Sequence, residues 1–244
     1  MMRLLPLLGI VAAAMTGTAL AISTQHTQGA RVSSRGAPVH PTVLELFQSQ
    51  GCSSCPPALN VLVREADRRD IIALNFAVTY WDQLGWKDQF AKPQFTARQW
   101  DYAHFNGRPE VATPQLIVNG RGFVNGGDQS EVDRAIEKFA ASEPGPTVRT
   151  VGDTLIIGPA KADRAATVWL VTYDPRILNV PIGAGENAGR TLPHRNIVKN
   201  LISLGSWRGS ARRLRLPGSE PTLRRAVLVQ AGTGGPIIAA SPIN

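Results

Sequence analysis

The sequence predicts an α/β domain followed by a smaller, sandwich-like all-β domain. Up to residue 142, apolar runs of strand length alternate with segments of helical periodicity, which is the order of an α/β architecture. Residues 148–244 instead hold short apolar runs separated by turn sequences, as in an antiparallel sandwich. The expected domains are therefore 41–142 and 148–244, joined by a linker at 143–147 that is rich in proline and glycine.

Residues 1–21 have the features of a secretory signal peptide. Arg3 precedes an apolar stretch that ends in Ala19-Leu20-Ala21, a typical cleavage pattern. The alternative is a membrane anchor, but Pro6 interrupts a run that is already short for the roughly 20 residues that a span needs. We therefore expect an exported protein, periplasmic or secreted, without stable membrane insertion. Residues 22–40 are polar and are expected to form a flexible lead.

The first domain is expected to contain alternating strands and helices. In order, they are a strand at 42–47, a helix at 58–67, a strand at 71–78, a helix at 96–106, strands at 111–118 and 121–124, and a helix at 128–141. Pro56 and Pro57 fit the first turn of a helix, where amide hydrogens have no helical partner. Asn119-Gly120 predicts a tight hairpin turn. Asp128, three residues before Glu131, predicts a capped helix start.

The second domain is expected to consist of short strands. The apolar runs lie at 148–151, 154–157, 167–173, 179–182, 197–204, 212–216, 226–230 and 236–240. Turn sequences such as Gly152-Asp153 and Gly234-Gly235-Pro236 separate them.

Cys52 and Cys55 are the only cysteines in the chain, and they lie between the first expected strand and the first expected helix. A structural disulfide would be ordinary in an oxidising compartment, but a bridge that closes so short a loop adds little stability. A helix start favours a thiolate, so the pair predicts thiol-disulfide exchange. We expect Cys52, as the more exposed thiol, to attack, and Cys55 to resolve the mixed disulfide.

The order of these elements is that of thioredoxin, with the cysteines where that fold carries its active site. Thr113-Pro114 matches the residue and cis-proline that face the cysteines in thioredoxin-like proteins, and it would let residue 113 pair with an extended substrate chain. Glu45, on the strand before the motif, is a candidate buried proton acceptor for Cys55. The alternative is an ordinary exposed glutamate.

Trp81 and Trp86 follow the second expected strand, near the cysteine end of the sheet. They are candidates for the walls of a substrate groove beside Cys52. Packing of a loop against the core is the alternative, because aromatic side chains commonly supply it.

Several motifs resemble a domain-of-unknown-function family of secreted thioredoxin-like proteins. They are LELFQSQGCSSCPPA at 44–58, YWDQLGWKD at 80–88, TPQ at 113–115, GENAGR at 185–190 and HRNIV at 194–198. The resemblance implies a thioredoxin-like domain with a C-terminal companion, and it names no substrate.

The second half of the chain is strongly basic. The whole chain has a formal net charge of +8, and residues 190–225 hold nine lysines and arginines against the single acid Glu220. A solvated sheet face is the expected explanation, and a surface for an anionic partner is the alternative. Because aromatic residues do not interleave with these charges, we expect no nucleic-acid partner.

Polar residues also cluster at 186–196, namely Glu186, Asn187, Arg190, His194 and Asn196. Glu186 and His194 could ligate a metal together with a cysteine thiolate. One acid and one histidine lack the spacing of a metal motif, so we expect a hydrogen-bonding network with no metal.

These observations favour an exported thiol-disulfide oxidoreductase that acts on protein or small-molecule thiols and disulfides, without a cofactor. One alternative is a non-catalytic binding or assembly protein on the same scaffold. Another is a metal carrier that uses the two thiolates.

Overall fold

The structure is a computed structural model that describes residues 40–140 and 145–243. The expected signal peptide, nearly all of the expected lead and part of the expected linker lie outside the described residues. Within them, no helix has the length and apolar character to cross a membrane. The described residues belong to one compact unit.

The first half of the chain alternates strands and helices in the predicted order. Its elements are β1 (Thr42–Gln48), α1 (Pro56–Glu65), β2 (Ile71–Ala77), the 3-10 helix η1 (Asp82–Leu84), α2 (Pro93–Phe105), β3 (Gln115–Val118), β4 (Gly122–Val124) and α3 (Gln129–Phe139). Two predicted starts differ from the structure by more than two residues. Helix α2 begins earlier, with a proline in its first turn, and β3 begins only after Pro114.

The described part of the second half contains strands. They are β5 (Val148–Val151), β6 (Thr154–Ile157), β7 (Ala166–Asp174), β8 (Leu178–Pro181), β9 (Thr191–His194), β10 (Ile197–Trp207), β11 (Arg212–Arg215), β12 (Arg224–Ala231) and β13 (Ile237–Ile243).

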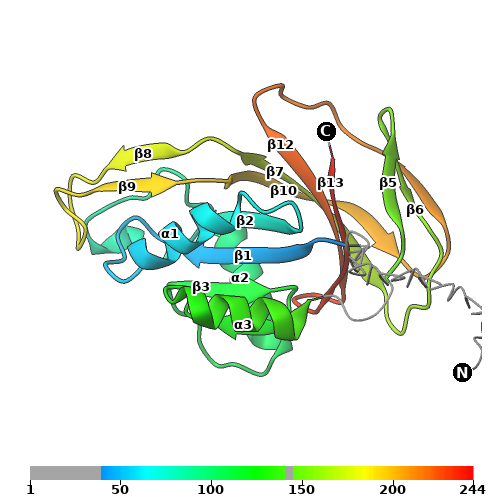
Figure 1. The fold of residues 1–244 in the computed structure, drawn as a ribbon, viewed down its shortest axis with the longest axis horizontal. Helices are drawn as coiled ribbons and strands as arrows, with labels where there is room; N and C mark the ends of the chain where they lie inside the picture. The colour runs from blue at the N-terminus through cyan, green and yellow to red at the C-terminus, as the bar shows by residue number, and fades with distance from the viewer. Residues whose placement is uncertain (1–39, 141–144, 244) are drawn as a thin grey trace, which may run out of the picture. The chain divides into compact units, whose positions relative to one another are not determined.

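Strands from both halves of the chain build one mixed sheet of eight strands, in the order β13-β12-β7-β10-β2-β1-β3-β4 (Figure 1). The strands of the second half therefore do not form the separate sandwich-like domain that the sequence predicts for residues 148–244, because β10 joins β2 in parallel at Ile197 and Asn75. The physical reason is that β2 has two hydrogen-bonding edges and β1 pairs with only one of them. Asn196 completes the junction, since its carbonyl accepts from the Asn75 amide at 3.0 Å.

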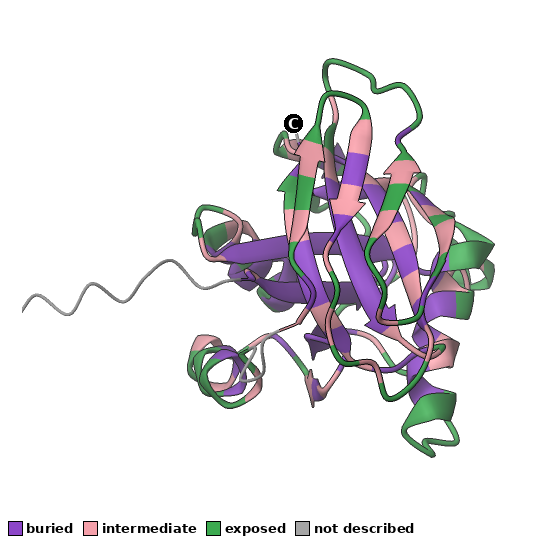
Figure 2. Ribbon diagram, turned by 90° about the vertical axis from the view of Figure 1, so that its right-hand side faces the viewer, coloured by how far each residue is buried: buried purple, intermediate pink, exposed green. Residues whose placement is uncertain are grey.

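Two smaller sheets complete the architecture: a three-stranded sheet in the order β11-β6-β5 and the β8–β9 hairpin. Figure 2 shows that burial differs between the sheets. Every residue of β1 and β2 is buried, while β5 and β11 alternate between half-buried and exposed positions. The first pattern is typical of central strands covered on both faces, and the second of a sheet with one face in solvent.

The two faces of β1 pack against different helices. Leu44 and Leu46 belong to a core with Leu59 of α1 and residues of α3, whereas Phe47 belongs to a core with Phe95 of α2. Successive strand residues point to opposite faces, so this alternation defines an α1 face and an α2 face of the sheet. A third core lies between the three-stranded sheet and strands β7 and β12.

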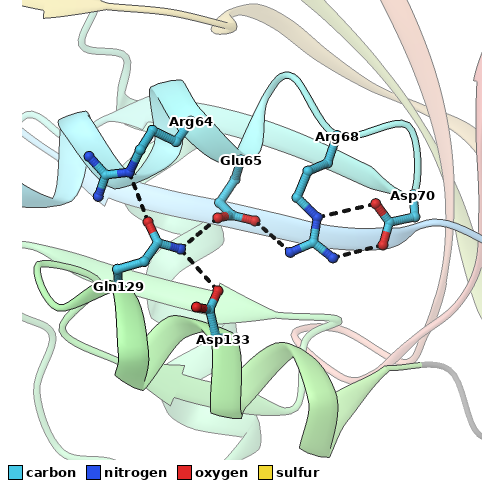
Figure 3. Close-up of polar contacts among 6 residues, drawn as sticks. All are labelled: Arg64, Glu65, Arg68, Asp70, Gln129 and Asp133. Atoms are coloured by element: carbon cyan, nitrogen blue, oxygen red, sulfur yellow. Dashed lines mark hydrogen bonds and ion pairs between the residues drawn. The ribbon is translucent and has the colours of Figure 1, made fainter.

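A polar network fastens α1 to α3 at the end of α1 remote from the cysteines (Figure 3). Glu65 is buried; its carboxylate accepts from Gln129 of α3 at 2.7 Å and from Arg68 at 3.1 Å. Arg64 donates to the other end of the Gln129 amide at 2.9 Å. The network therefore helps to orient the helix that begins beside the cysteine pair.

Candidate functional site

Cys52 and Cys55 form a disulfide immediately before α1, with their Cα atoms 5.5 Å apart. Cys55 is the N-cap of the helix, and its carbonyl accepts from Leu59 at 3.1 Å. Both cysteines are 0% exposed, whereas Ser53 and Ser54 between them are exposed. The expectation that Cys52 would be the more exposed thiol is therefore wrong for this disulfide state.

The segment that contains Thr113 and Pro114 lies beside residues 50–55, the cysteine turn between β1 and α1. The Thr113–Pro114 peptide bond is cis, the isomer expected from its position. Ser54 connects the two segments, because its hydroxyl lies 3.3 Å from the Cys52 sulfur and makes a long contact of 3.5 Å with the Thr113 carbonyl. The Thr113 hydroxyl is buried and has no hydrogen-bond partner among the described residues.

Glu45 is fully buried, but its carboxylate belongs to an ion pair with Arg98 of α2. The two side chains meet at 2.6 Å and 3.1 Å, and the Tyr102 hydroxyl also donates to Glu45. Because Glu45 alternates with Leu44 and Leu46, it points to the α2 face, whereas Cys55 caps the helix on the α1 face. The structure thus pairs Glu45 with Arg98. It does not place Glu45 beside Cys55, where the predicted role as proton acceptor requires it.

Trp81 and Trp86 both lie near the cysteine turn, in different surroundings. Trp81 packs against the core on the α2 face and lies close to Gly51. The Trp86 indole donates to the Gln50 side chain at 2.9 Å. Its ring also packs against the β8–β9 hairpin, where a Cβ added at Gly183 would lie 3.1 Å from it. Trp86 therefore connects the cysteine turn with the hairpin.

The tip of the β8–β9 hairpin contacts the cysteine turn directly. The Asn187 amide donates to the carbonyls of Gln50 at 2.9 Å and Cys52 at 2.8 Å, and its oxygen accepts from Arg190 at 2.8 Å. The Glu186 carboxylate accepts from the Ser53 amide at 3.0 Å. Hydrogen bonds from Ser53 lower the pKa of Glu186, which stays ionised there.

The sequence predicts a polar network for Glu186 and Asn187, but it gives no indication that they lie beside the cysteines. Asn187 is 135 residues from Cys52 along the chain, so no local pattern relates them. A signal for an unusual turn is nevertheless present, because Gly185 and Gly189 flank the two polar residues and both have positive φ.

Asp88 bonds to the start of the cysteine turn, and the sequence provides no reason to select it as a site residue. Its carboxylate accepts from the amides of Gln50 at 2.9 Å and Phe90 at 2.8 Å. Burial raises the pKa of Asp88 to about 6, and the two amide hydrogen bonds partly oppose that shift.

His194 lies in β9, where its backbone is opposite Leu178, away from the hairpin tip that holds Glu186. It is fully buried; its ring packs edge-on against Phe90 at 5.6 Å, and burial lowers its pKa to about 4. The structure therefore does not pair His194 with Glu186. In the described ranges, no group of three or more histidine, cysteine or acidic side chains is placed to hold a metal.

The fold and the site define a mixed α/β protein with a disulfide-linked cysteine pair at a strand-to-helix junction. The chain matches the family model described as a protein of unknown function (DUF1223) over residues 43–230, and it belongs to that family. Among the curated proteins, no match was found.

Two solved structures are similar to this chain. One is the crystal structure of a structural genomics protein from Agrobacterium tumefaciens, with 31% identity and a TM-score of 0.68; the match covers 83% of this chain and 93% of that one. The other is HBP35 of Porphyromonas gingivalis, with 16% identity and a TM-score of 0.54, over 84% of this chain and 74% of that one. The second likeness concerns the fold alone.

Proposed function

We propose that this protein is an exported thiol-disulfide oxidoreductase on a thioredoxin-like scaffold. The observation that carries the proposal is the Cys52–Cys55 disulfide at the start of α1, beside the cis Thr113–Pro114 segment. A pair at this spacing can close a disulfide within one turn of the chain, and no further cysteine exists to exchange with it. The export part of the proposal rests on the sequence of residues 1–21 alone.

In the oxidising direction, a substrate thiolate attacks the Cys52 sulfur. The Cys52–Cys55 bond breaks, and Cys55 leaves as a thiolate that takes a proton from solvent. A second substrate thiolate then attacks the substrate sulfur of the mixed disulfide and releases Cys52. Two substrate thiols have become a disulfide, and an external disulfide must reoxidise the pair. The reverse sequence reduces a substrate disulfide and needs an external dithiol.

One feature of the surroundings of Cys52 favours its role as the attacked sulfur, and two features oppose it. The Ser54 hydroxyl, 3.3 Å away, can donate to a Cys52 thiolate. Because Pro56 and Pro57 carry no amide hydrogen, the first helical turn offers fewer donors than an ordinary helix start. Both sulfurs are buried, so an incoming sulfur can reach Cys52 only after the loop around it shifts.

The proposal is tested by exchange with a model disulfide and by trapping of mixed disulfides. The reduced wild-type protein is expected to exchange with oxidised glutathione. Cys52→Ser should lose at least about a hundredfold in rate, because it removes the attacking thiolate. Cys55→Ala should accumulate a mixed disulfide on Cys52, because the resolving thiol is absent. Equal exchange rates for wild type and Cys52→Ser would refute the proposal.

Burial of both cysteines favours a second candidate, a non-catalytic binding or assembly protein with an inert disulfide. The exposed face of the three-stranded sheet is basic: Arg213 and Arg149 lie in one row on either side of Ile156. Resistance of the disulfide to excess dithiol in the folded protein, together with binding of an anionic partner that Arg149→Ala and Arg213→Ala weaken, would favour this candidate.

A further inference from the structure

Glu186 bonds to a backbone group inside the cysteine turn. Its carboxylate lies 3.0 Å from the amide nitrogen of Ser53, the residue that follows Cys52. Amide hydrogens at such a turn are the groups that stabilise a cysteine thiolate in a redox-active pair. Here one of them is already bonded to a negatively charged side chain.

Other amides near the turn are also unavailable. Pro56 and Pro57 have none, and the Cys55 amide donates to the Cys52 carbonyl at 3.2 Å. The bond of Glu186 to Ser53 therefore removes one of a small number of donors. A carboxylate beside Cys52 also repels a thiolate there, with an energy that solvent reduces because Glu186 is exposed.

Asn187 holds Glu186 in this place. Its buried side chain bonds to the carbonyls of Gln50 and Cys52, so the hairpin tip and the cysteine turn are fastened together next to Glu186. The neighbouring charged side chains do not bond to the residues between the two cysteines. Arg190 donates to Asn187, and Asp88 accepts from Gln50 and Phe90. Within the described residues, Glu186 is the charged side chain that bonds to a backbone group between the two cysteines, at Ser53.

We propose that Glu186 is a positioning residue that disfavours the Cys52 thiolate and thereby stabilises the disulfide form of the pair. Asn187 keeps Glu186 at the Ser53 amide. This inference rests on the redox function proposed above, and it assigns the control of that reaction to a hairpin far from the cysteines in sequence.

The test compares Glu186→Gln with wild type, both in the Cys55→Ala background, where Cys52 is the sole thiol. Glutamine can still accept from Ser53 but carries no charge. The ionisation of Cys52 is followed by the ultraviolet absorbance of the thiolate across a pH series, a signal that does not require a reagent to reach the buried sulfur. The acid ionisation constant of Cys52 is expected to be about two- to fivefold larger in Glu186→Gln, which corresponds to the interaction energies of exposed charge pairs. Molar salt should reduce that difference.

Glu220→Gln is the matched control, because it removes an equal charge from an exposed loop between β11 and β12. It should leave the ionisation of Cys52 unchanged. In the protein with both cysteines, Glu186→Gln should also shift the equilibrium with glutathione toward the reduced pair by a similar factor.

The two proposals fail in different ways. Suppose that wild type exchanges with glutathione, while the ionisation constant of Cys52 is the same with Glu186→Gln, with Glu220→Gln and with neither substitution. The role of Glu186 is then refuted and the redox function stands. If wild type does not exchange, the redox function is refuted, and the absorbance series still decides whether Glu186 acts on Cys52.

Discussion

Two buried acids, Glu45 in strand β1 and Asp88 in the loop before α2, illustrate how single residues meet the cost of burial in different ways. Glu45 is paired with a buried arginine, so its charge is balanced. Asp88 is bonded to backbone amides, and burial is the largest influence on its pKa. The first arrangement makes the acid depend on its partner, and the second makes it sensitive to pH.

Asp88 should titrate about two pH units above an ordinary aspartate. Its pKa is raised to about 6, so the folded state binds a proton more tightly than the unfolded state does. The contribution of Asp88 to the free energy of unfolding therefore falls as the pH rises from about 4 to about 6, and then levels off. Carboxyl NMR of labelled aspartate measures the midpoint. A midpoint of about 4, the ordinary value for an aspartate, would contradict this prediction.

Removal of Arg98 should cost much more stability than removal of an exposed basic residue. Arg98→Met leaves Glu45 buried without its partner, with an expected loss of about 3–5 kcal/mol in the free energy of unfolding. Lys161→Met is the control, because Lys161 pairs with Asp163 at 3.4 Å in solvent and should cost less than about 1 kcal/mol. Urea denaturation measures both, and equal losses would show that the buried pair has no special weight.

At the scale of the element, the β8–β9 hairpin acts as a support for the cysteine turn. Its inner side chains Val180, Ile182 and Leu192 form a small core with Trp86 and Phe90. The tip then reaches Gln50 and Cys52 through Asn187. The hairpin thus combines apolar packing along its length with specific hydrogen bonds at its end.

Asn187→Ala should destabilise the protein by about 1–3 kcal/mol, because it leaves the buried carbonyls of Gln50 and Cys52 without their donor. Asn179→Ala, at an exposed position of β8, should change stability by less than about 0.5 kcal/mol. Chemical denaturation of the two disulfide-bonded variants provides the comparison. A loss for Asn187→Ala no larger than that for Asn179→Ala would show that the tip does not hold the turn.

At the scale of the whole molecule, the continuous sheet makes the two halves of the chain interdependent. The core on the α2 face combines Phe47 and Phe76 from the first half with Val171 and Leu228 from the second. Strand β2 would lose its β10 neighbour if the second half were removed. The halves therefore share both hydrogen bonds and buried apolar surface.

The full chain is expected to unfold in one transition. Tryptophan fluorescence, which reports on Trp81, Trp86 and Trp100 of the first half as well as Trp169 and Trp207 of the second, should change at the same denaturant concentration as the far-ultraviolet circular dichroism of the helices in the first half. A fragment of residues 41–142 should show no cooperative transition, because it exposes the edge of β2 and half of a shared core. Two separate transitions in the full chain would contradict this expectation.

Local patterns in the sequence were sufficient for much of the first half. The helix start at Asp128 was predicted from capping chemistry, and its carboxylate does accept from Ser130 at 2.8 Å. The Asn119-Gly120 turn joins β3 and β4 as expected, with positive φ at both residues. These features depend on neighbours within a few residues, which the sequence states directly.

What the sequence determined by itself is the cysteine pair, its place between a strand and a helix, and the Thr113-Pro114 dipeptide that accompanies it. Only the tertiary structure decided that β10 extends the sheet at β2, that Glu45 pairs with Arg98, and that Glu186 and Asn187 close on the cysteine turn. The physical reason is the distance along the chain between the residues that interact. Helix caps, turns and periodicity follow from nearby residues, whereas strand order, ion pairs and hairpin contacts depend on how surfaces distant in sequence satisfy each other's buried polar and apolar groups.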